Sequence, residues 1–163
     1  MQPIKEAYLD IETTGLTPIY DEITVVGIYL CDGISREVVQ LVGREATVDS
    51  ILSALKGVGV IYTYNGTSFD LPFIRSRLSI NIASVAEHHD LMYDCWRNNL
   101  YGGFKAVERQ LGIERELKEV NGYEAVKLWW RYVDYSDTDA LATLLEYNKE
   151  DVLNLRVLKE MLL

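Results

Sequence analysis

The dipeptide Asp32-Gly33 constrains the fold of this chain strongly, because it lies between two segments that are rich in β-branched residues. Glu22–Cys31 precedes it, and Ser35–Val42 follows it. An Asp-Gly pair between two such segments is typical of a tight β-hairpin turn. We therefore predict that the two segments pair as antiparallel strands and form part of a β-sheet.

Further strands are predicted on both sides of this hairpin. Polar and apolar residues alternate over Ile4–Glu12, and short apolar segments predict strands over Val58–Tyr64 and Val85–Asp90. Helical spacing of apolar residues predicts helices over residues 48–56, 71–78, 91–99, 104–111, 123–132 and from about residue 138 onward. This order predicts an α/β fold with a five-stranded mixed sheet, in which helical crossovers join the later strands.

The length of 163 residues favours a single domain that spans residues 1–163. No apolar run is long enough to span a bilayer, and the N-terminus lacks the pattern of a signal peptide. The two cysteines, Cys31 and Cys95, are too few for a disulfide framework or a thiolate zinc site. We therefore expect a cytoplasmic protein with reduced cysteines that does not associate with a membrane.

The formal net charge of -9 argues against a protein that binds nucleic acid by bulk positive charge alone. It does not exclude a nucleic-acid enzyme that uses metal ions. The stretch Arg97–Arg131 is cationic, with seven basic and five acidic residues, and aromatic residues are interleaved with them. This stretch forms either solvated helix faces over buried aromatics or a surface that attracts phosphates and stacks bases.

Asp10 and Glu12 lie two residues apart at the C-terminal end of the first predicted strand. Because side chains alternate along a strand, both carboxylates lie on the same face, about 7 Å apart along the chain. Two such carboxylates repel each other unless a proton or a cation lies between them. The pair is either a ligand set for hard divalent cations or a pair of ordinary surface acids at an exposed strand end.

Two more acidic residues stand at informative places. Asp70 comes directly before a predicted helix, as a helix N-cap or as a third carboxylate at the end of a strand-loop-helix unit. Tyr147 and Asp151 are four residues apart on the last predicted helix and therefore share a face. Tyr147 alone is typical of a core aromatic, but an unpaired carboxylate beside an apolar stripe is costly and indicates a function.

Three segments in this order resemble the exonuclease motifs of the DEDD superfamily. They are Leu9–Leu16 with the sequence LDIETTGL, the segment from Asn65 to Asp70, and Tyr147 with Asp151 in the pattern Y-x-x-x-D. The tyrosine four residues before the last aspartate resembles the DEDDy branch of that superfamily. The resemblance implies a ribonuclease H-like fold.

A narrower resemblance involves Gly102–Ile113 and Gly122–Trp129, which are similar to predicted ribonuclease H-like exonuclease domains of bacteria and archaea. It implies a 3′–5′ exonuclease that acts on single-stranded ends of DNA or RNA with two divalent ions, Mg²⁺ or Mn²⁺. No glycine-rich phosphate loop is present, and we expect no organic cofactor. Two alternatives stay open: a non-catalytic module that binds nucleic acid or protein, and a structure-specific endonuclease on the same fold.

The resemblance also implies a role for each motif residue. Asp10 would bridge the two metal ions, and Glu12 and Asp151 would complete the site of the ion that activates water. Asp70 would hold the second ion through water. Tyr147 would orient the attacking water. Two divalent ions so held stabilise both the attacking and the leaving oxygen of a displacement at phosphorus.

Residues next to these motifs are candidates for substrate contacts. By resemblance, Thr13, Thr14 and Leu16 would contact the terminal nucleotide. Leu16 is either a wedge against a base or a buried turn residue. Asn65 either touches the substrate or ends the preceding strand.

The segment His88-His89-Asp90 suggests a zinc site at first sight. Adjacent residues on a strand point to opposite faces, so we expect that the two histidines do not share one ion. Asp90 is then either a residue that supports the metal ligands from outside or a structural residue at the end of the sheet. Phe69 and Phe73 are expected in the core rather than stacked on a substrate.

Overall fold

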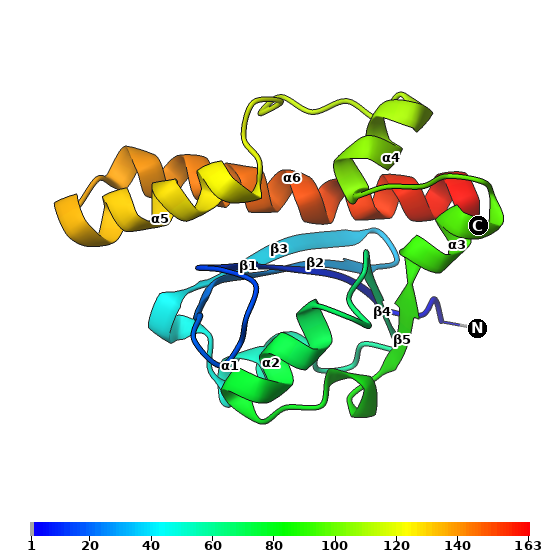
Figure 1. Cartoon of the computed structure of the whole chain (residues 1–163). Coiled ribbons are helices and arrows are strands. Elements are labelled where there is room, and N and C mark those ends of the chain that lie inside the picture. Colours follow the sequence, from blue (N-terminus) through cyan, green and yellow to red (C-terminus); the bar gives the residue numbers. More distant parts are fainter. Residues whose placement is uncertain (1) are drawn as a thin grey trace.

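The computed structural model describes residues 2–163 as an α/β fold with one five-stranded sheet in the order β3-β2-β1-β4-β5 (Figure 1). The strands are β1 (Glu6–Thr13), β2 (Ile23–Asp32), β3 (Ser35–Val42), β4 (Val60–Thr63) and β5 (Glu87–Asp90). Strands β1, β2 and β3 pair antiparallel, and β4 runs parallel to both β1 and β5. The predicted fold class and the hairpin at Asp32-Gly33 are confirmed.

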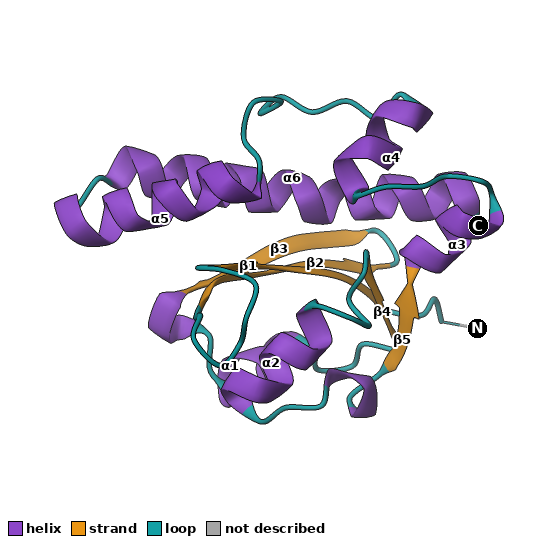
Figure 2. Cartoon of the chain, in the orientation of Figure 1, coloured by secondary structure: helices purple, strands orange, loops and turns teal. Residues whose placement is uncertain are grey.

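Helices cover both faces of the sheet (Figure 2). Helices α1 (Val48–Ala54) and α2 (Asp70–Leu78) lie on one face, and short 3-10 turns occupy Gly43–Glu45 and Ile82–Ser84. The other face carries α3 (Leu91–Arg97), α4 (Phe104–Leu111), α5 (Gly122–Tyr135) and α6 (Thr138–Leu162). Within residues 2–163, no helix combines the length and the apolar character that a membrane span requires.

Most predicted boundaries are shifted by a few residues, and β5 differs most. The strand begins at Glu87 rather than at Val85, because the residues before it form the 3-10 turn Ile82–Ser84. Among the described residues β5 pairs only with β4, from Val60 opposite Glu87 to Thr63 opposite Asp90. β5 is therefore no longer than the short strand that it pairs with.

The face toward α1 and α2 is an apolar core. It combines Leu9, Ile11 and Ile28 of the sheet with Ile51 of α1 and Phe73 of α2, all nearly inaccessible to solvent. Phe69 packs against this cluster, and its ring centroid lies 5.6 Å from that of Phe73. The expectation that both phenylalanines belong to the core is confirmed.

Helix α6 is the element that completes the opposite face. The side chain of Asp137 caps its N-terminus by accepting a hydrogen bond from the backbone N–H of Ala140, at 3.0 Å. Leu144, Val152 and Leu155 are buried against the sheet, together with polar residues of the same helix. An otherwise apolar helix face therefore carries polar groups directly over β1.

A glycine lets α6 approach the sheet closely at this point. Gly27 of β2 pairs with Asp10 of β1, and a Cβ atom on Gly27 would lie only 2.1 Å from Oδ1 of Asn148. Any side chain on Gly27 would therefore displace Asn148. In turn, Nδ2 of Asn148 lies 3.3 Å from the backbone oxygen of Asp10 and donates a hydrogen bond to it.

Candidate metal centre

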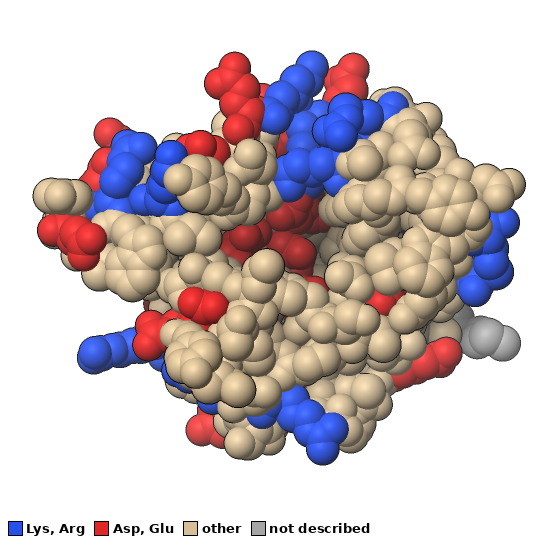
Figure 3. Space-filling view, viewed as in Figure 1, with Lys and Arg blue, Asp and Glu red and all other residues tan. Residues whose placement is uncertain are grey.

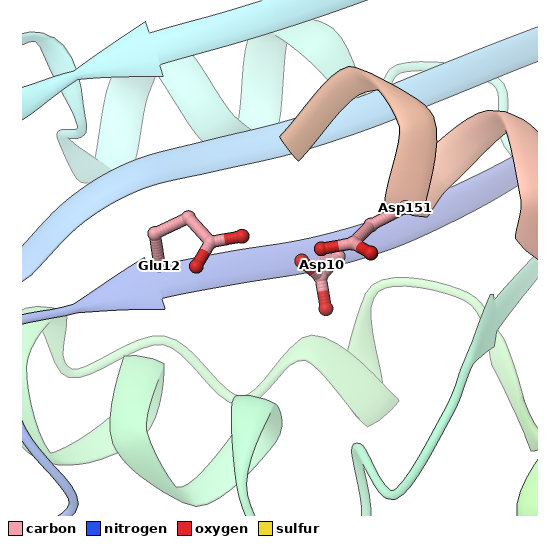
Figure 4. Close-up of side chains that lie close together, drawn as sticks. All are labelled: Asp10, Glu12 and Asp151. Carbon is pink, nitrogen blue, oxygen red and sulfur yellow. The ribbon is translucent and has the colours of Figure 1, made fainter. Parts of the chain in front are cut away.

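Three carboxylates converge between the centre of the sheet and α6. Asp10, Glu12 and Asp151 each offer one oxygen, and these oxygens lie within 4.8 Å of one another. Figure 4 shows that Asp10 and Glu12 rise from β1 while Asp151 reaches toward them from α6. The prediction that Asp10 and Glu12 share a face is confirmed, and the fold adds Asp151 from far along the chain.

Burial makes this cluster electrostatically costly. Glu12 is 9% exposed, Asp151 is 6% exposed, and Asp10 is half-buried. Burial raises the pKa of Asp10 well above its usual range, and the nearby charges of Asp151 and Glu12 raise it further. Burial, with the charge of Asp151 next, likewise raises the pKa of Glu12. Three oxygen ligands that resist ionisation together are suited to a hard divalent cation, which would remove their repulsion.

Asp70, the fourth predicted carboxylate, lies beside this cluster but is not one of the three close oxygens. It is the first residue of α2, so the alternative that it precedes the helix as N-cap is wrong; Phe69 holds that position. Its Oδ2 accepts a hydrogen bond from the backbone N–H of Ile11, at 3.0 Å. Burial raises the pKa of Asp70 to about 7, and its charge contributes to the raised pKa of Asp10.

Tyr147 lies one helical turn before Asp151 and is 3% exposed. Burial raises the pKa of its hydroxyl, and the charge of Asp151 adds to this, so the group stays protonated at neutral pH. Nζ of Lys105 in α4 donates a hydrogen bond to the Tyr147 hydroxyl and lies 4.4 Å from the centre of its ring. A tyrosine and a lysine therefore stand together at the border of the cluster.

Arg115 is a residue of the site that the sequence did not single out. Its Nε donates hydrogen bonds to both carboxylate oxygens of Glu108, at 2.8 and 3.0 Å, and its Nη2 pairs with Asp151. Arg115 is 7% exposed, and its Nη1 is the one buried side-chain nitrogen or oxygen without a hydrogen-bond partner within residues 2–163. The only available signal was its place within the cationic stretch Arg97–Arg131.

Asn148 is a second residue that the sequence analysis missed. Besides its contact with the Asp10 backbone, its Oδ1 accepts a hydrogen bond from Nε2 of Gln40 at 3.0 Å. Asn148 is completely buried. The available signal was its position on the last helix, between Tyr147 and Asp151 and next to an apolar stripe. An amide that is buried there needs specific partners.

The predicted substrate contacts lie at the end of β1, in the loop that follows it, and just after β4. The Thr13 hydroxyl donates to the backbone oxygen of Gly15 at 2.6 Å, and the Thr14 hydroxyl accepts from the backbone N–H of Glu22 at 2.9 Å. Both hydroxyls thus shape the loop. Leu16 is 83% exposed at the loop surface, so the alternative of a buried turn residue is wrong.

Asn65 follows β4 with a left-handed backbone, at φ 61°. Its backbone N–H donates to Oδ1 of Asp90 at 2.8 Å, and Oδ1 of Asp90 also accepts from the N–H of Met92 in the first turn of α3. Asp90 therefore joins two loops at the end of the sheet, and its predicted structural role is confirmed. The backbone of Asn65 thus turns the chain after β4, and its predicted contact with the substrate stays a prediction.

The two histidines have separate partners. Nε2 of His88 lies 2.8 Å from the Thr63 hydroxyl, and Nε2 of His89 pairs with Asp94. This confirms that His88 and His89 do not share one site.

A hollow marks the centre on the molecular surface. Figure 3 shows acidic side chains inside this hollow and basic side chains along its border on the side of α4. Lys105, Arg109, Arg115 and Lys118 line a cavity of about 450 Å³ in this region. Some aromatics of the cationic stretch are exposed, with Tyr101 at 58% and Trp130 at 43%, so they are not simply buried under solvated helix faces.

The chain is similar to a bacterial protein and to solved structures. It is 28% identical over 171 residues to the protein YprB of Bacillus subtilis (strain 168), a match that covers 91% of this chain and 39% of the relative. This chain therefore spans well under half of that relative's length.

The family B DNA polymerase of the archaeon Pyrobaculum calidifontis matches 98% of this chain and 24% of its own, with a TM-score of 0.75 and 18% identity. NrnC of Brucella melitensis, in a structure with bound pGG, matches 99% of this chain and 72% of its own, with a TM-score of 0.67 and 22% identity. These likenesses concern the fold.

The family assignment rests on a model for the RNase_H superfamily, which matches residues 7–163. This range contains the whole sheet except the first residue of β1, and all three clustered carboxylates. It agrees with the fold that the sequence motifs led us to expect. The chain belongs to the RNase_H superfamily.

Proposed function

We propose that this domain is a metal-dependent 3′–5′ exonuclease of the DEDDy branch that hydrolyses phosphodiester bonds at single-stranded ends of DNA or RNA. The observation that carries the proposal is the convergence of Asp10, Glu12 and Asp151, with oxygens within 4.8 Å of one another, beside Tyr147. We propose residues 1–163 as one domain, in which residues 2–163 form one sheet with helices on both faces. Its two cysteines are free and buried, which fits a reduced, cytoplasmic setting.

The donor set fits divalent ions of the Mg²⁺ or Mn²⁺ type, because it consists of carboxylate oxygens alone. Asp10, Glu12 and Asp151 would hold one ion, and Asp10 together with Asp70, the latter through water, would hold a second. When bound, two such ions stabilise the charge on the attacking and leaving oxygens of the displacement. NrnC, whose fold is similar, has one structure with bound Mg²⁺ and another with bound pGG, which supports this proposal.

The chain's own residues would orient the reacting groups. The Tyr147 hydroxyl accepts a hydrogen bond from Lys105, so its proton remains available for an oxygen of water or phosphate. Arg115 fixes the Asp151 carboxylate by an ion pair from the other side. Thr13 and Thr14 shape the loop that presents Leu16 to the terminal nucleotide, and Asn65 contacts the same nucleotide from the end of β4.

The direct test is cleavage of oligonucleotides that carry a label at the 5′ end, with DNA and RNA versions and with free or blocked 3′ ends, in Mn²⁺. We expect a ladder that shortens from the free 3′ end and is absent from the blocked one. Asp10→Asn should reduce the rate by more than about 100-fold, because it removes a shared ligand. Asp49→Asn, a change of the same type at an exposed position of α1, should leave the rate unchanged.

Each alternative has its own outcome. Cleavage of circular single strands or of 3′-blocked substrates into discrete fragments would show an endonuclease. No cleavage, together with no Mn²⁺ binding at millimolar concentration in calorimetry, would show a non-catalytic binding module. Equal activity of wild type and Asp10→Asn would refute the proposed site.

A further inference from the structure

A second groove lies at the end of the sheet, beyond the loop that follows β1. It has a volume of about 520 Å³, the size of a typical small-ligand pocket. Its lining comes from α5, from the end of α2 and from the 3-10 turn after β3, and it includes Glu22, Arg44, Arg77, Trp129, Trp130 and Tyr132. None of these residues belongs to the proposed catalytic set.

The groove adjoins the metal centre through the strand end that carries Glu12. Thr13, the next residue, pairs with Ile23, and Ile23 lines the groove. Glu22 at its edge exchanges hydrogen bonds with Thr14: the Thr14 N–H donates to its backbone oxygen, and its own N–H donates to the Thr14 hydroxyl, both at 2.9 Å. The groove therefore begins where the proposed contacts to the terminal nucleotide end.

Aromatic rings form one wall of the groove. Trp129 lies so close to Gly43 that a Cβ atom there would be 3.2 Å from the indole ring. The ring centroids of Trp129 and Tyr132 are 5.7 Å apart, and Trp130 is 43% exposed. The packing contacts hold Trp129, and Trp130 next to it presents exposed indole surface, which is well suited to stack on a nucleobase whatever the base sequence.

Two arginines form the other side. Arg44 and Arg77 are both exposed, and within residues 2–163 neither forms an ion pair with a carboxylate. Glu22 is the acidic residue of the lining. Two uncompensated guanidinium groups on a chain of net charge -9 indicate a ligand that carries negative charge.

We propose that this groove binds the single-stranded nucleic acid upstream of the 3′ end that enters the metal centre. Arg44 and Arg77 contact its phosphates, and Trp130 stacks on a base. The inference rests on the proposed function and deepens it, because it predicts that the enzyme prefers strands long enough to reach from the metal centre to the groove. A peptide partner or a second copy of this chain would not require phosphate contacts, so the test below separates them.

The first measurement compares kcat/KM for a dinucleotide and for a 12-nucleotide strand. The double variant Arg44→Ala, Arg77→Ala should lose at least about tenfold on the long strand and nothing on the dinucleotide. Trp130→Ala should show the same selectivity, with a loss of about tenfold on the long strand. The control Lys56→Ala, Arg75→Ala removes the same charge from exposed positions outside the groove and should change neither value.

The second measurement is binding of the 12-nucleotide strand to the Asp10→Asn protein, which does not depend on cleavage. The slope of log K against log salt should become shallower by about 1.4 when Arg44 and Arg77 are replaced, since single strands contribute about 0.7 per phosphate contact. If strand binding depends on the groove but the wild-type protein cleaves no strand, the proposed exonuclease activity is overturned and the proposed groove is kept. Cleavage that responds equally to the groove and control variants would overturn the groove alone.

A further result would reassign the groove. Sedimentation that shows a wild-type dimer, lost in Trp130→Ala while strand binding stays unchanged, would assign it to a second copy of the chain. That outcome overturns the proposal.

Discussion

The two faces of the sheet use one strand for opposite purposes. On β1, Leu9 and Ile11 point toward α1 and α2 and are buried in an apolar cluster. Asp10 and Glu12, which alternate with them, point toward α6 and gather a third carboxylate, Asp151. The apolar face contributes favourable burial, whereas the carboxylate face concentrates negative charge away from water.

Along β1, residues that stabilise the fold therefore alternate with residues that we propose for catalysis, and the two kinds face opposite sides of the sheet. Substitutions on the α1–α2 face should reduce the free energy of unfolding and preserve catalysis by the folded protein. Replacing the clustered carboxylates Asp10 or Glu12 should reduce the proposed catalysis and preserve the free energy of unfolding. Arg115, which compensates their charge, is the exception.

Arg115 compensates buried negative charge next to the carboxylate cluster, and its replacement should have the largest effect on the free energy of unfolding. Arg115→Met leaves Glu108 and Asp151 buried without their partner, so the free energy of unfolding should fall by about 4 kcal/mol. Arg131→Met breaks an exposed ion pair with Asp137, which water screens, and should lower the free energy of unfolding far less. Urea denaturation measures both; equal losses would contradict the role given to Arg115.

Leu9→Ala is the corresponding test on the apolar face. Leu9 is 1% exposed, and the cavity left by its truncation should lower the free energy of unfolding by about 3 kcal/mol. The exposed Ile34→Ala serves as control and should stay within about 0.5 kcal/mol of wild type. The kcat of folded Leu9→Ala should remain near that of wild type, and a loss as large as that of Asp10→Asn would deny the separation of the two faces.

The same alternation explains how much of the molecule could be predicted from the sequence. Period-two spacing placed Asp10 and Glu12 on one face, and helical spacing placed Tyr147 and Asp151 on another, so only their meeting required the fold. The hairpin and the helical crossovers between the later strands predicted a mixed sheet and hence the fold class, whereas the order of the strands came from the structure. Local periodicity was sufficient wherever a residue's direction is set by its own element.

Arg115 could not be predicted because it lies outside every helix and strand. Its partner Asp151 is 36 residues away, and no periodic pattern relates the two. The predicted length of β5 was wrong for a similar reason, because that length depends on the extent of β4 rather than on the residues of Val85–Asp90. Contacts between distant segments decided both features.

Tyr147→Phe tests the carboxylate face without changing its shape. The phenyl ring preserves the packing, while Lys105 loses its hydrogen-bond acceptor and the site loses a hydroxyl. We expect the single-turnover rate to fall by about 10- to 100-fold with little change in the melting temperature. Tyr8→Phe is the matched control, because the buried Tyr8 donates to Glu6 away from the cluster; it should keep the rate, and a similar loss there would refute a specific role of Tyr147.

The smallest effect is a dependence of the metal-free protein on pH. The pKa of Asp70 is raised to about 7 by burial, and burial also raises the pKa values of Asp10 and Glu12. Above pH 4 the folded state therefore binds more protons than the unfolded state. The free energy of unfolding consequently falls as pH rises from about 4 to about 7.

We expect the melting temperature in EDTA to be lower at pH 8 than at pH 5.5, by about 3 °C or more. His88 acts in the opposite direction, because burial lowers its pKa and its contribution to stability grows as pH rises toward 6.5.

Asp10→Asn leaves His88 unchanged and removes one of the repelling charges, so it should narrow the difference between the melting temperatures at pH 5.5 and pH 8. Mn²⁺ should stabilise wild type more at pH 8 than at pH 5.5, since the cation binds the ionised carboxylates. A melting temperature in EDTA that rises between these pH values in wild type and in Asp10→Asn alike would mean that the carboxylate face does not carry the repulsion that separates it from the apolar one.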